Sequence, residues 1–189
     1  MTNDRILHDA VALVASVVRN IQLKRALQAA DPNPPLNFWR LMNGNSFDMA
    51  VIDWCKLFGS ERDPLHWKNV LPEAEWDEFR AGLLRATDFS ADEWAGYREK
   101  VKEYRDKHAA HFDPTFIEAA NEPEYPALSE AFYAACLYYD RLCRLFADRG
   151  IKHRYPRDIR DYSRRFADQT AEVAKKAIEA TKGLKERVQ

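Results

Sequence analysis

The chain has 189 residues, of which 46% are apolar and 31% are charged, with six glycines. This composition is typical of a globular protein and excludes a wholly disordered or fibrous chain, while the length favours one domain over two. The formal net charge of -1 creates no global basic field, so binding to nucleic acid or to a membrane surface would require a local patch.

Cysteine usage and the N-terminus bear on the cellular compartment. Cys55, Cys136 and Cys143 are an odd number of cysteines without the Cys-x-x-Cys spacing of zinc sites. This pattern argues against a disulfide framework and favours a reducing compartment. Charged residues interrupt the first apolar residues, and no run of eighteen apolar residues occurs. We therefore expect a cytoplasmic protein without a membrane segment.

Proline and glycine divide the first half of the chain into helical segments. Apolar residues recur at spacings of three and four from Asn3 to Ala30, which predicts a long first helix that ends at the proline-rich stretch 31–35. A second helix is expected from Leu36 to Phe58, before Gly59. A third is expected from Pro72 to about Arg85, because proline suits the first turn of a helix.

The middle of the chain contains an expected ordered loop and a capping signal. Segment 60–70 is polar but includes a Leu-His-Trp run, so we expect it to pack against the body of the protein. Ser90 and Glu93 have the spacing of a capping box, in which each side chain binds a backbone N–H group of the first turn. This signal predicts a fourth helix from Ser90 to about His111.

Two further helices complete the expected fold. One follows Pro126 and ends at Gly150, and the other begins near Pro156. Toward the C-terminus, residues 176–189 carry little apolar surface and are expected to fray or extend from the body. The sequence shows no strand-like alternation and no internal repeat. It therefore predicts an all-α protein, a single domain over residues 1–189 built as an antiparallel bundle of five to six helices.

The fourth helix carries the residues with the clearest chemical potential. Spacings of three and four place six of its residues on one stripe: Trp94, Tyr97, Val101, Tyr104, His108 and His111. At 100° per residue, Arg105 lies about 120° from His111. On a regular helix, these two side chains therefore do not point the same way.

The residues alone leave two interpretations of His108 and His111. Both can be half-buried residues at a helix end, where the negative end of the helix dipole favours an imidazolium. Alternatively, they can form a metal site with Asp113, since histidines three residues apart share a helix face. His66 or His153 could then approach as a further ligand.

The run Arg105-Asp106-Lys107-His108-Ala109-Ala110-His111 resembles the signature of the HEPN superfamily (higher eukaryotes and prokaryotes nucleotide-binding). In that signature an arginine is followed by a polar residue and, a few residues later, by a histidine. With a tyrosine before the run and an aspartate after it, at a helix end in a small helical chain, it is similar to the abortive-infection branch. Residues 53–59 look like the second core helix of that branch. The resemblance covers about residues 5–150.

The resemblance implies an antiparallel helical bundle that forms a homodimer with its motifs facing each other. In active members it implies a metal-independent endoribonuclease without a cofactor, and for a defence or toxin protein a neutralising antitoxin as partner. Other members are non-catalytic nucleotide- or protein-binding modules.

In the implied chemistry, His111 would move a proton between the RNA 2′-hydroxyl and the leaving oxygen. Arg105 would stabilise the charge on the phosphorane, and Asp106 would orient one of these two residues. His108 matches no invariant position of the family, so the resemblance leaves open which histidine acts.

A basic run downstream is a candidate RNA-binding surface. Two tyrosines, Tyr155 and Tyr162, are interleaved with its arginines and could stack on bases. The candidate RNA-binding residues are Arg154, Arg157, Arg160 and Arg164. The alternative is a solvated helix face on which neighbouring aspartates balance the arginines.

Overall fold

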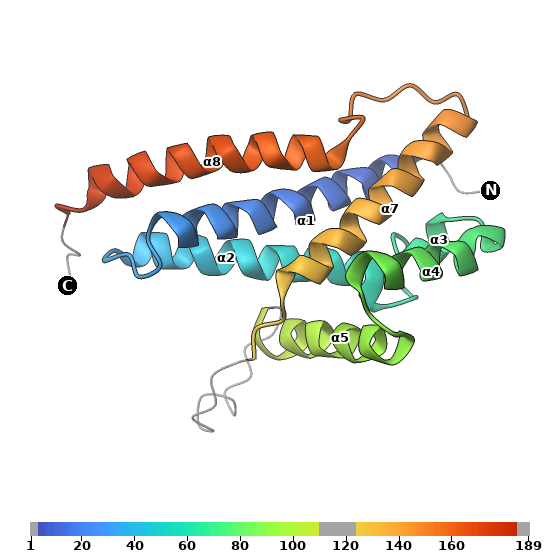
Figure 1. Cartoon of the computed structure of the whole chain (residues 1–189), viewed down its shortest axis with the longest axis horizontal. Coiled ribbons are helices and arrows are strands. Elements are labelled where there is room, and N and C mark those ends of the chain that lie inside the picture. Colours follow the sequence, from blue (N-terminus) through green and yellow to red (C-terminus); the bar gives the residue numbers. More distant parts are fainter. Residues whose placement is uncertain (1–3, 110–123, 185–189) are drawn as a thin grey trace.

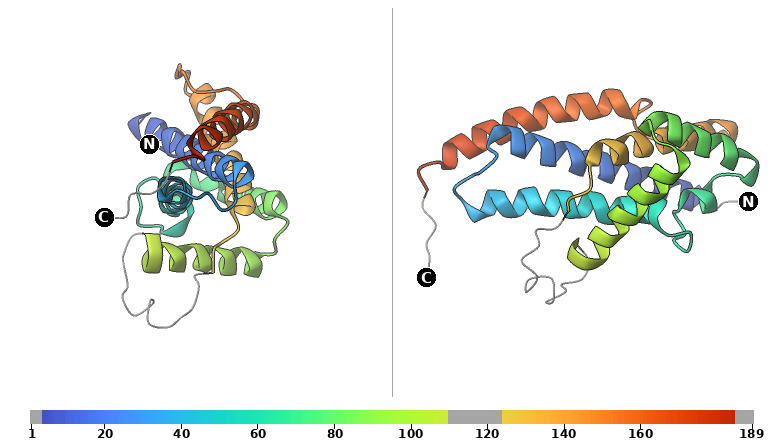
Figure 2. Two further views of the ribbon diagram at one scale, coloured as in Figure 1. Left: turned by 90° about the vertical axis from the view of Figure 1, so that its left-hand side faces the viewer. Right: turned by 60° about the horizontal axis from the view of Figure 1, so that its bottom comes forward.

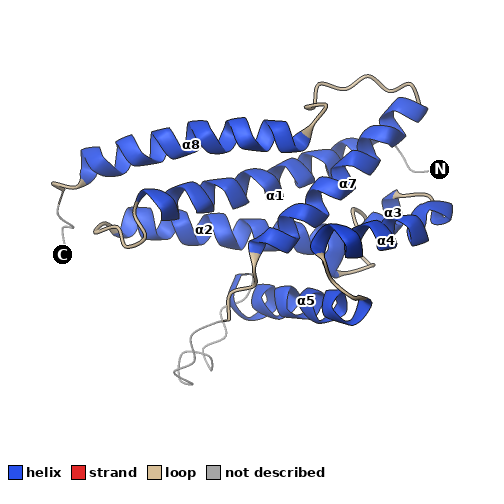
Figure 3. Ribbon diagram, in the orientation of Figure 1, coloured by secondary structure: helices blue, strands red, loops and turns tan. Residues whose placement is uncertain are grey.

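The computed structural model describes residues 4–109 and 124–184 (Figure 1). In these residues the fold is all-helical and contains no strand (Figure 3), which confirms the expected all-α class. The α-helices are α1 (Asp4–Ala30), α2 (Asn37–Trp54), α3 (Trp67–Val70), α4 (Trp76–Thr87), α5 (Ala91–Tyr104), α7 (Leu128–Asp148) and α8 (Ile159–Thr181). Two π-helical turns, η1 (Cys55–Gly59) and η3 (Arg105–Ala109), continue α2 and α5, and a 3₁₀ turn, η2 (Glu73–Glu75), precedes α4.

The central helix of the fold is α1. It packs against α2, α7 and α8, and the views of Figures 1 and 2 place it between α2 and α8. Seven of its apolar side chains have no solvent exposure: Leu7, Ala10, Val11, Val14, Val17, Val18 and Ile21. Burial of such side chains provides the main driving force for folding, about 1.5–3 kcal/mol for each of the larger ones.

The length and composition of α1 would also allow it to cross a membrane, and among the described residues it is the one helix of this kind. The same test is passed by signal sequences and by core helices that are mostly buried. In this structure the apolar stripe of α1 is covered by α2, α7 and α8.

Side-chain contacts fix the directions of the helices around α1. The Ser16 hydroxyl donates to Asp53 Oδ2 at 2.8 Å, so α2 returns alongside α1 in the opposite direction. Gln22 Nε2 donates to Ser163 Oγ at 2.7 Å near the start of α8, and Leu27 packs against Ile178 near its end. Helix α8 therefore runs parallel to α1, whereas the sequence prediction was an antiparallel bundle.

The C-terminal part of α8 is packed further along than the sequence suggested. Ala174 and Ile178 are each 3% exposed and form a small cluster with Leu27, while Trp39 Nε1 donates to Thr181 Oγ1 at 2.8 Å. Residues 176–181 are thus helical, and these two contacts hold them to the body although this part of the chain carries no long apolar stripe. Residues 185–189 lie outside the described part of the chain.

Helix α5 is attached to the end of α2 through η1. Arg98 Nε donates to the Phe58 carbonyl at 2.8 Å, and its Nη2 donates to the Gly59 carbonyl at 3.2 Å. These bonds satisfy carbonyl groups that the end of a helix leaves without partners. Trp54 stacks on Phe58 with ring centroids 5.0 Å apart, and Trp94 of α5 meets both rings edge-on.

The predicted start of α5 and its buried face are both confirmed. Ser90 Oγ accepts from the Glu93 N–H group at 3.3 Å, and the Ser90 N–H group donates to Glu93 Oε2 at 2.8 Å. The described part of the expected stripe is buried at four positions, Trp94, Tyr97, Val101 and Tyr104, and partly buried at His108. The expectation that segment 60–70 packs down also holds, and α3 forms within it.

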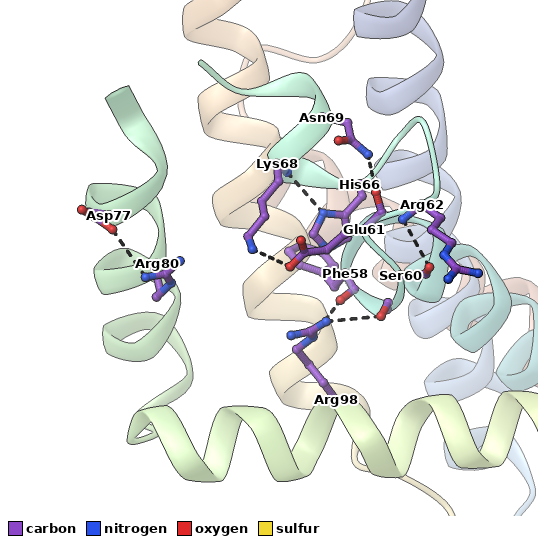
Figure 4. Close-up of polar contacts among 11 residues, drawn as sticks. Phe58, Ser60, Glu61, Arg62, His66, Lys68, Asn69, Asp77, Arg80 and Arg98 are labelled. Carbon is purple, nitrogen blue, oxygen red and sulfur yellow. Dashed lines mark hydrogen bonds and ion pairs between the residues drawn. The ribbon is translucent and has the colours of Figure 1, made fainter. Parts of the chain in front are cut away.

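His66 is the most deeply buried titratable residue of segment 60–70, with 1% of its surface exposed. Its Nδ1 accepts from the Lys68 N–H group at 3.3 Å and caps α3 (Figure 4). Burial, helped by the nearby Arg98 guanidinium, lowers the pKa of His66 from its usual 6.5 to about 4, although Glu61 opposes this shift. At neutral pH His66 is therefore an uncharged residue.

The lowered pKa of His66 predicts a specific acid sensitivity. Between pH 6.5 and pH 4, the unfolded chain binds a proton at this residue that the folded chain does not. Stability is therefore full above pH 6.5 and falls as the pH drops toward 4, by about 3 kcal/mol from this residue. The measurement is urea unfolding of wild type and His66→Asn across this range, since asparagine can still cap α3. Parallel pH profiles for the two proteins would contradict the assignment.

Candidate functional site

The candidate site lies where α5 ends. Its α-helical hydrogen bonding stops at Tyr104, and residues 105–109 form the wider π-helical turn η3. The 100° rotation per residue that separates Arg105 from His111 therefore does not apply beyond Tyr104. His111 and Asp113 lie outside the described residues, so the relative position of Arg105 and His111 stays a prediction.

Arg105 and Asp106 are brought together. Arg105 Nε and Nη2 lie 2.7 and 2.6 Å from the same Asp106 Oδ1 atom. The Arg105 side chain is 25% exposed. Its charge is close enough to η1 to oppose the burial that raises the pKa of the Cys55 thiol to about 12. The guanidinium therefore already holds a carboxylate, which an RNA phosphate would have to replace.

His108 contacts the aromatic stripe and lines a small pocket. Its ring centroid lies 5.2 Å from that of Tyr104. The pocket has a volume of about 130 Å³, and its lining residues are Lys100, Glu103, Tyr104, Lys107, His108 and Glu124. Lys100 pairs with Glu124 at 2.8 Å, and Lys107 pairs with Glu103. The lysines of this pocket are therefore largely balanced by carboxylates.

Two aromatic rings, those of Phe47 and Tyr125, pack against Tyr104 and connect this pocket to a larger one. Phe47 lies 5.1 Å from Tyr104 and 5.3 Å from Tyr125 between centroids, and Tyr104 lies 5.5 Å from Tyr125. The Tyr104 hydroxyl donates to Asp48 Oδ1 at 2.8 Å. Burial, followed by this carboxylate, raises the pKa of Tyr104 above its usual value, so the phenol stays protonated.

The larger cavity has a volume of about 530 Å³ and is lined by basic residues on one side and by aromatic residues on the other. Its lining residues among the described ranges 4–109 and 124–184 are Lys24, Arg25, Gln28, Phe47, Tyr125, Pro126, Leu128 and Ser129, which include no carboxylate. The Arg25 guanidinium lies 5.5 Å from the centroid of Phe132. Within the described residues, neither Lys24 nor Arg25 forms an ion pair. A cavity of this kind suits a planar base on the aromatic side and a phosphate on the basic side.

The sequence pattern does not indicate this cavity. Lys24 and Arg25 stand next to each other near the end of an otherwise apolar helix, which was the available signal. Phe47 reads as an ordinary core residue, and the position of Tyr125 depends on how the chain returns after α5. The spacing of residues along one helix does not reveal contacts between α1, α2 and the start of α7.

The predicted RNA-binding arginines are not part of this site. Helices α5 and α8 lie on opposite sides of α1 and α2 in Figures 1 and 2, and the arginines belong to the start of α8 and the segment before it. Arg160 pairs with Asp140 at 2.7 Å, and Arg164 pairs with Asp161 at 3.2 Å. These pairs match the alternative of a solvated face balanced by aspartates. Arg154 and Arg157 are exposed.

The two other candidate metal ligands are occupied elsewhere. His66 caps α3, and His153 packs against Phe146 and Tyr155 with centroids 4.8 and 5.7 Å apart. In residues 4–109 and 124–184, no group of three or more His, Cys, Asp or Glu side chains is arranged to hold a metal ion.

No family model, curated protein or solved structure matches the chain. The resemblance to the HEPN superfamily therefore stays a prediction that rests on residues 105–111, of which 105–109 are described. The chemistry of the site has to be inferred from its own residues.

The hydrogen bond from Tyr104 to Asp48 predicts a measurable contribution to stability. Tyr104→Phe removes the donor, so that Asp48 loses this hydrogen-bond partner. We expect the free energy of unfolding to fall by about 1–2 kcal/mol. Urea unfolding measures the change. Tyr133→Phe is the matched control, because Tyr133 is 48% exposed. Equal stability of the two variants would contradict the role of this bond.

Proposed function

We propose that the chain is a HEPN-like, metal-independent endoribonuclease of a defence or toxin type that acts in the cytoplasm. The observation that supports this proposal best is the continuity between the motif and a basic, aromatic cavity. His108 contacts Tyr104, and Tyr104 contacts Phe47 and Tyr125, which line the cavity with Lys24. Single-stranded RNA needs this combination of stacking surfaces and cations.

In the proposed reaction, His111 takes the proton of the RNA 2′-hydroxyl or delivers one to the leaving oxygen. Arg105 releases Asp106 and binds the phosphate oxygens, where a permanent and forked donor stabilises the growing charge. Asp106 then orients either residue. His108 is the alternative proton carrier, because it lies on the same stripe and lines the pocket beside Tyr104.

The proposed active form is a homodimer in which two motifs face each other, with a neutralising antitoxin as a further partner. The six helices of twelve or more residues, α1, α2, α4, α5, α7 and α8, would form the superfamily's helical bundle, with α8 added in parallel to α1. A site assembled from two chains would also remove the need for Arg105 and His111 to meet on one helix.

A non-catalytic nucleotide- or protein-binding module is the second candidate. The observation that favours it is the contact between Arg105 and Asp106, which satisfies the guanidinium without any substrate. In such a module the cavity beside Lys24 and Arg25 would bind a nucleotide that is not cleaved.

Cleavage of single-stranded RNA in the presence of EDTA tests the first candidate. We expect products with 2′,3′-cyclic phosphate ends, and a loss of about 100-fold or more in rate for Arg105→Ala and for His111→Ala. His108→Ala decides which histidine carries the proton. Lys176→Ala on α8 is the control and should cleave at the wild-type rate. Full cleavage by His111→Ala would contradict its assignment, and RNA binding without cleavage by the wild type would favour the second candidate.

The cavity predicts which cations bind RNA. A Lys24→Ala and Arg25→Ala double variant should bind single-stranded RNA about tenfold more weakly and show a shallower dependence on salt, because two phosphate contacts are lost. Fluorescence anisotropy at several salt concentrations measures both effects. An Arg154→Ala and Arg157→Ala double variant is the matched comparison. If only this second variant weakens binding, RNA binds the opposite side of the molecule.

A further inference from the structure

A separate pocket of about 170 Å³ lies where segment 60–70, α4 and α5 meet (Figure 4). Its inner walls are the buried residues His66, Trp67, Leu83 and Trp94. Its charged lining residues are Glu61, Lys68, Arg80 and Arg98. It is smaller than the roughly 300–1,000 Å³ of typical organic ligand sites, so it suits a small ligand or a single group of a larger one.

The charges in this pocket are unbalanced. Three cations reach it from three different helices, Lys68 from α3, Arg80 from α4 and Arg98 from α5. Among the lining residues in the described part of the chain, Glu61 is the one carboxylate, and it pairs with Lys68. Asp77, outside the lining, pairs with Arg80 at 3.4 Å and is 96% exposed, so its attraction is strongly screened by water.

Arg98 is held in a fixed orientation. Its Nε and Nη2 atoms donate to the Phe58 and Gly59 carbonyls, and the guanidinium faces the loop that carries Glu61 (Figure 4). Within the described part of the chain, Arg98 forms no ion pair with a carboxylate. A fixed guanidinium whose charge lacks a carboxylate partner is prepared to bind an anion without reorganisation.

His66 adds a buried donor to the same pocket. Because its Nδ1 accepts from the Lys68 N–H group, the neutral ring carries its proton on Nε2. The Phe58 carbonyl lies close enough to favour the protonated ring, but it accepts from Arg98 Nε, and Nε2 makes no hydrogen bond of normal geometry. A buried donor whose nearest acceptor is shared with Arg98 is only partly satisfied, and an anion in the pocket would give it a stronger acceptor.

We propose that this pocket binds a tetrahedral anion of the phosphate class, held by Lys68, Arg98 and the Nε2–H group of His66. Arg80 closes the outer side. In the unliganded protein the Glu61 carboxylate pairs with Lys68, and the bound anion replaces this carboxylate. The apolar walls of Trp67 and Trp94 exclude water and strengthen these contacts.

The phosphate group can come from a free phosphate or from the backbone of RNA. Arg98 precedes Arg105, the first residue of η3, by seven residues, and the α-helical turns of α5 between them place the two residues on the same side, about 10 Å apart. The anion site does not depend on the proposed cleavage reaction. It would exist in an inactive protein as well.

Titration calorimetry with inorganic phosphate, using the full chain at neutral pH and low salt, tests this proposal. We expect saturable binding to wild type, with affinity about tenfold lower for Lys68→Ala and about threefold lower for the more exposed Arg80→Ala. Glu61→Gln should bind phosphate more tightly than wild type by about tenfold, because it removes the competing carboxylate. Lys176→Ala, which also breaks a Lys–Glu pair, is the control and should bind as wild type does.

Thermal unfolding of each variant checks that the fold is intact. For Arg98 the variant to test is Arg98→Lys and not Arg98→Ala, because a lysine can keep a hydrogen bond to the carbonyls at the end of η1. A single-stranded oligoribonucleotide that displaces phosphate from wild type, but binds Lys68→Ala less tightly, identifies the RNA backbone as the source; no displacement identifies a free phosphate. Absence of saturable phosphate binding, or unchanged affinity in Glu61→Gln and Lys68→Ala with the fold intact, would overturn the proposal.

Discussion

The position of α5 depends on the two hydrogen bonds that Arg98 donates to the Phe58 and Gly59 carbonyls. The helix made of α2 and η1 ends there, and its last carbonyls would otherwise need water or another cap. The same guanidinium thus ends one helix and attaches the next. Because Trp94 packs edge-on against Trp54 and Phe58, the polar contact is reinforced by a dry aromatic one.

The two π-helical turns lie on the two helices that Arg98 connects. Helix α5 packs on η1, and α2 packs on η3, while the Cys55 thiol faces the Val101 carbonyl at 3.9 Å. A π-helical turn widens the backbone and changes the direction of the following side chains, and such turns are frequent at functional sites. The motif of residues 105–111 thus begins at Arg105, where the backbone changes from α-helical to π-helical geometry. This π-helical turn packs against α2 and does not project into solvent.

The parts of the fold that could be predicted from the sequence are those coded locally. The 3.6-residue pattern, the capping box at Ser90 and the stop at Gly150 depend on residues within one or two turns of each other. Gly150 has a φ of +65°, a conformation that glycine adopts without strain. The π-helical turns, the parallel direction of α8 and the packing of Ile178 depend on contacts between distant segments, which no periodicity encodes.

The same distinction applies to the candidate sites. Arg105, Asp106 and His108 are adjacent in sequence, so a motif can bring them to attention. Lys24 and Tyr125 become neighbours only through the packing of α1, α2 and α7. From the sequence, His66 is a candidate only as a further metal ligand, whereas the structure buries it beside Arg98 and Lys68. A short polar loop gave no indication that its histidine would be an uncharged donor.

Which cations can bind phosphate is decided by the carboxylates around them, because the net charge of -1 supplies no general attraction. Arginines dominate the start of α8, yet Asp161 alone pairs with both Arg164 and Arg165 there. Lys24 and Arg25 are fewer, but their cavity has no carboxylate among the lining residues that the structure describes. Partial burial lowers the pKa of Lys24, which means that its charge lacks full hydration. A phosphate gains more from such a cation than from an exposed arginine that already has an aspartate beside it.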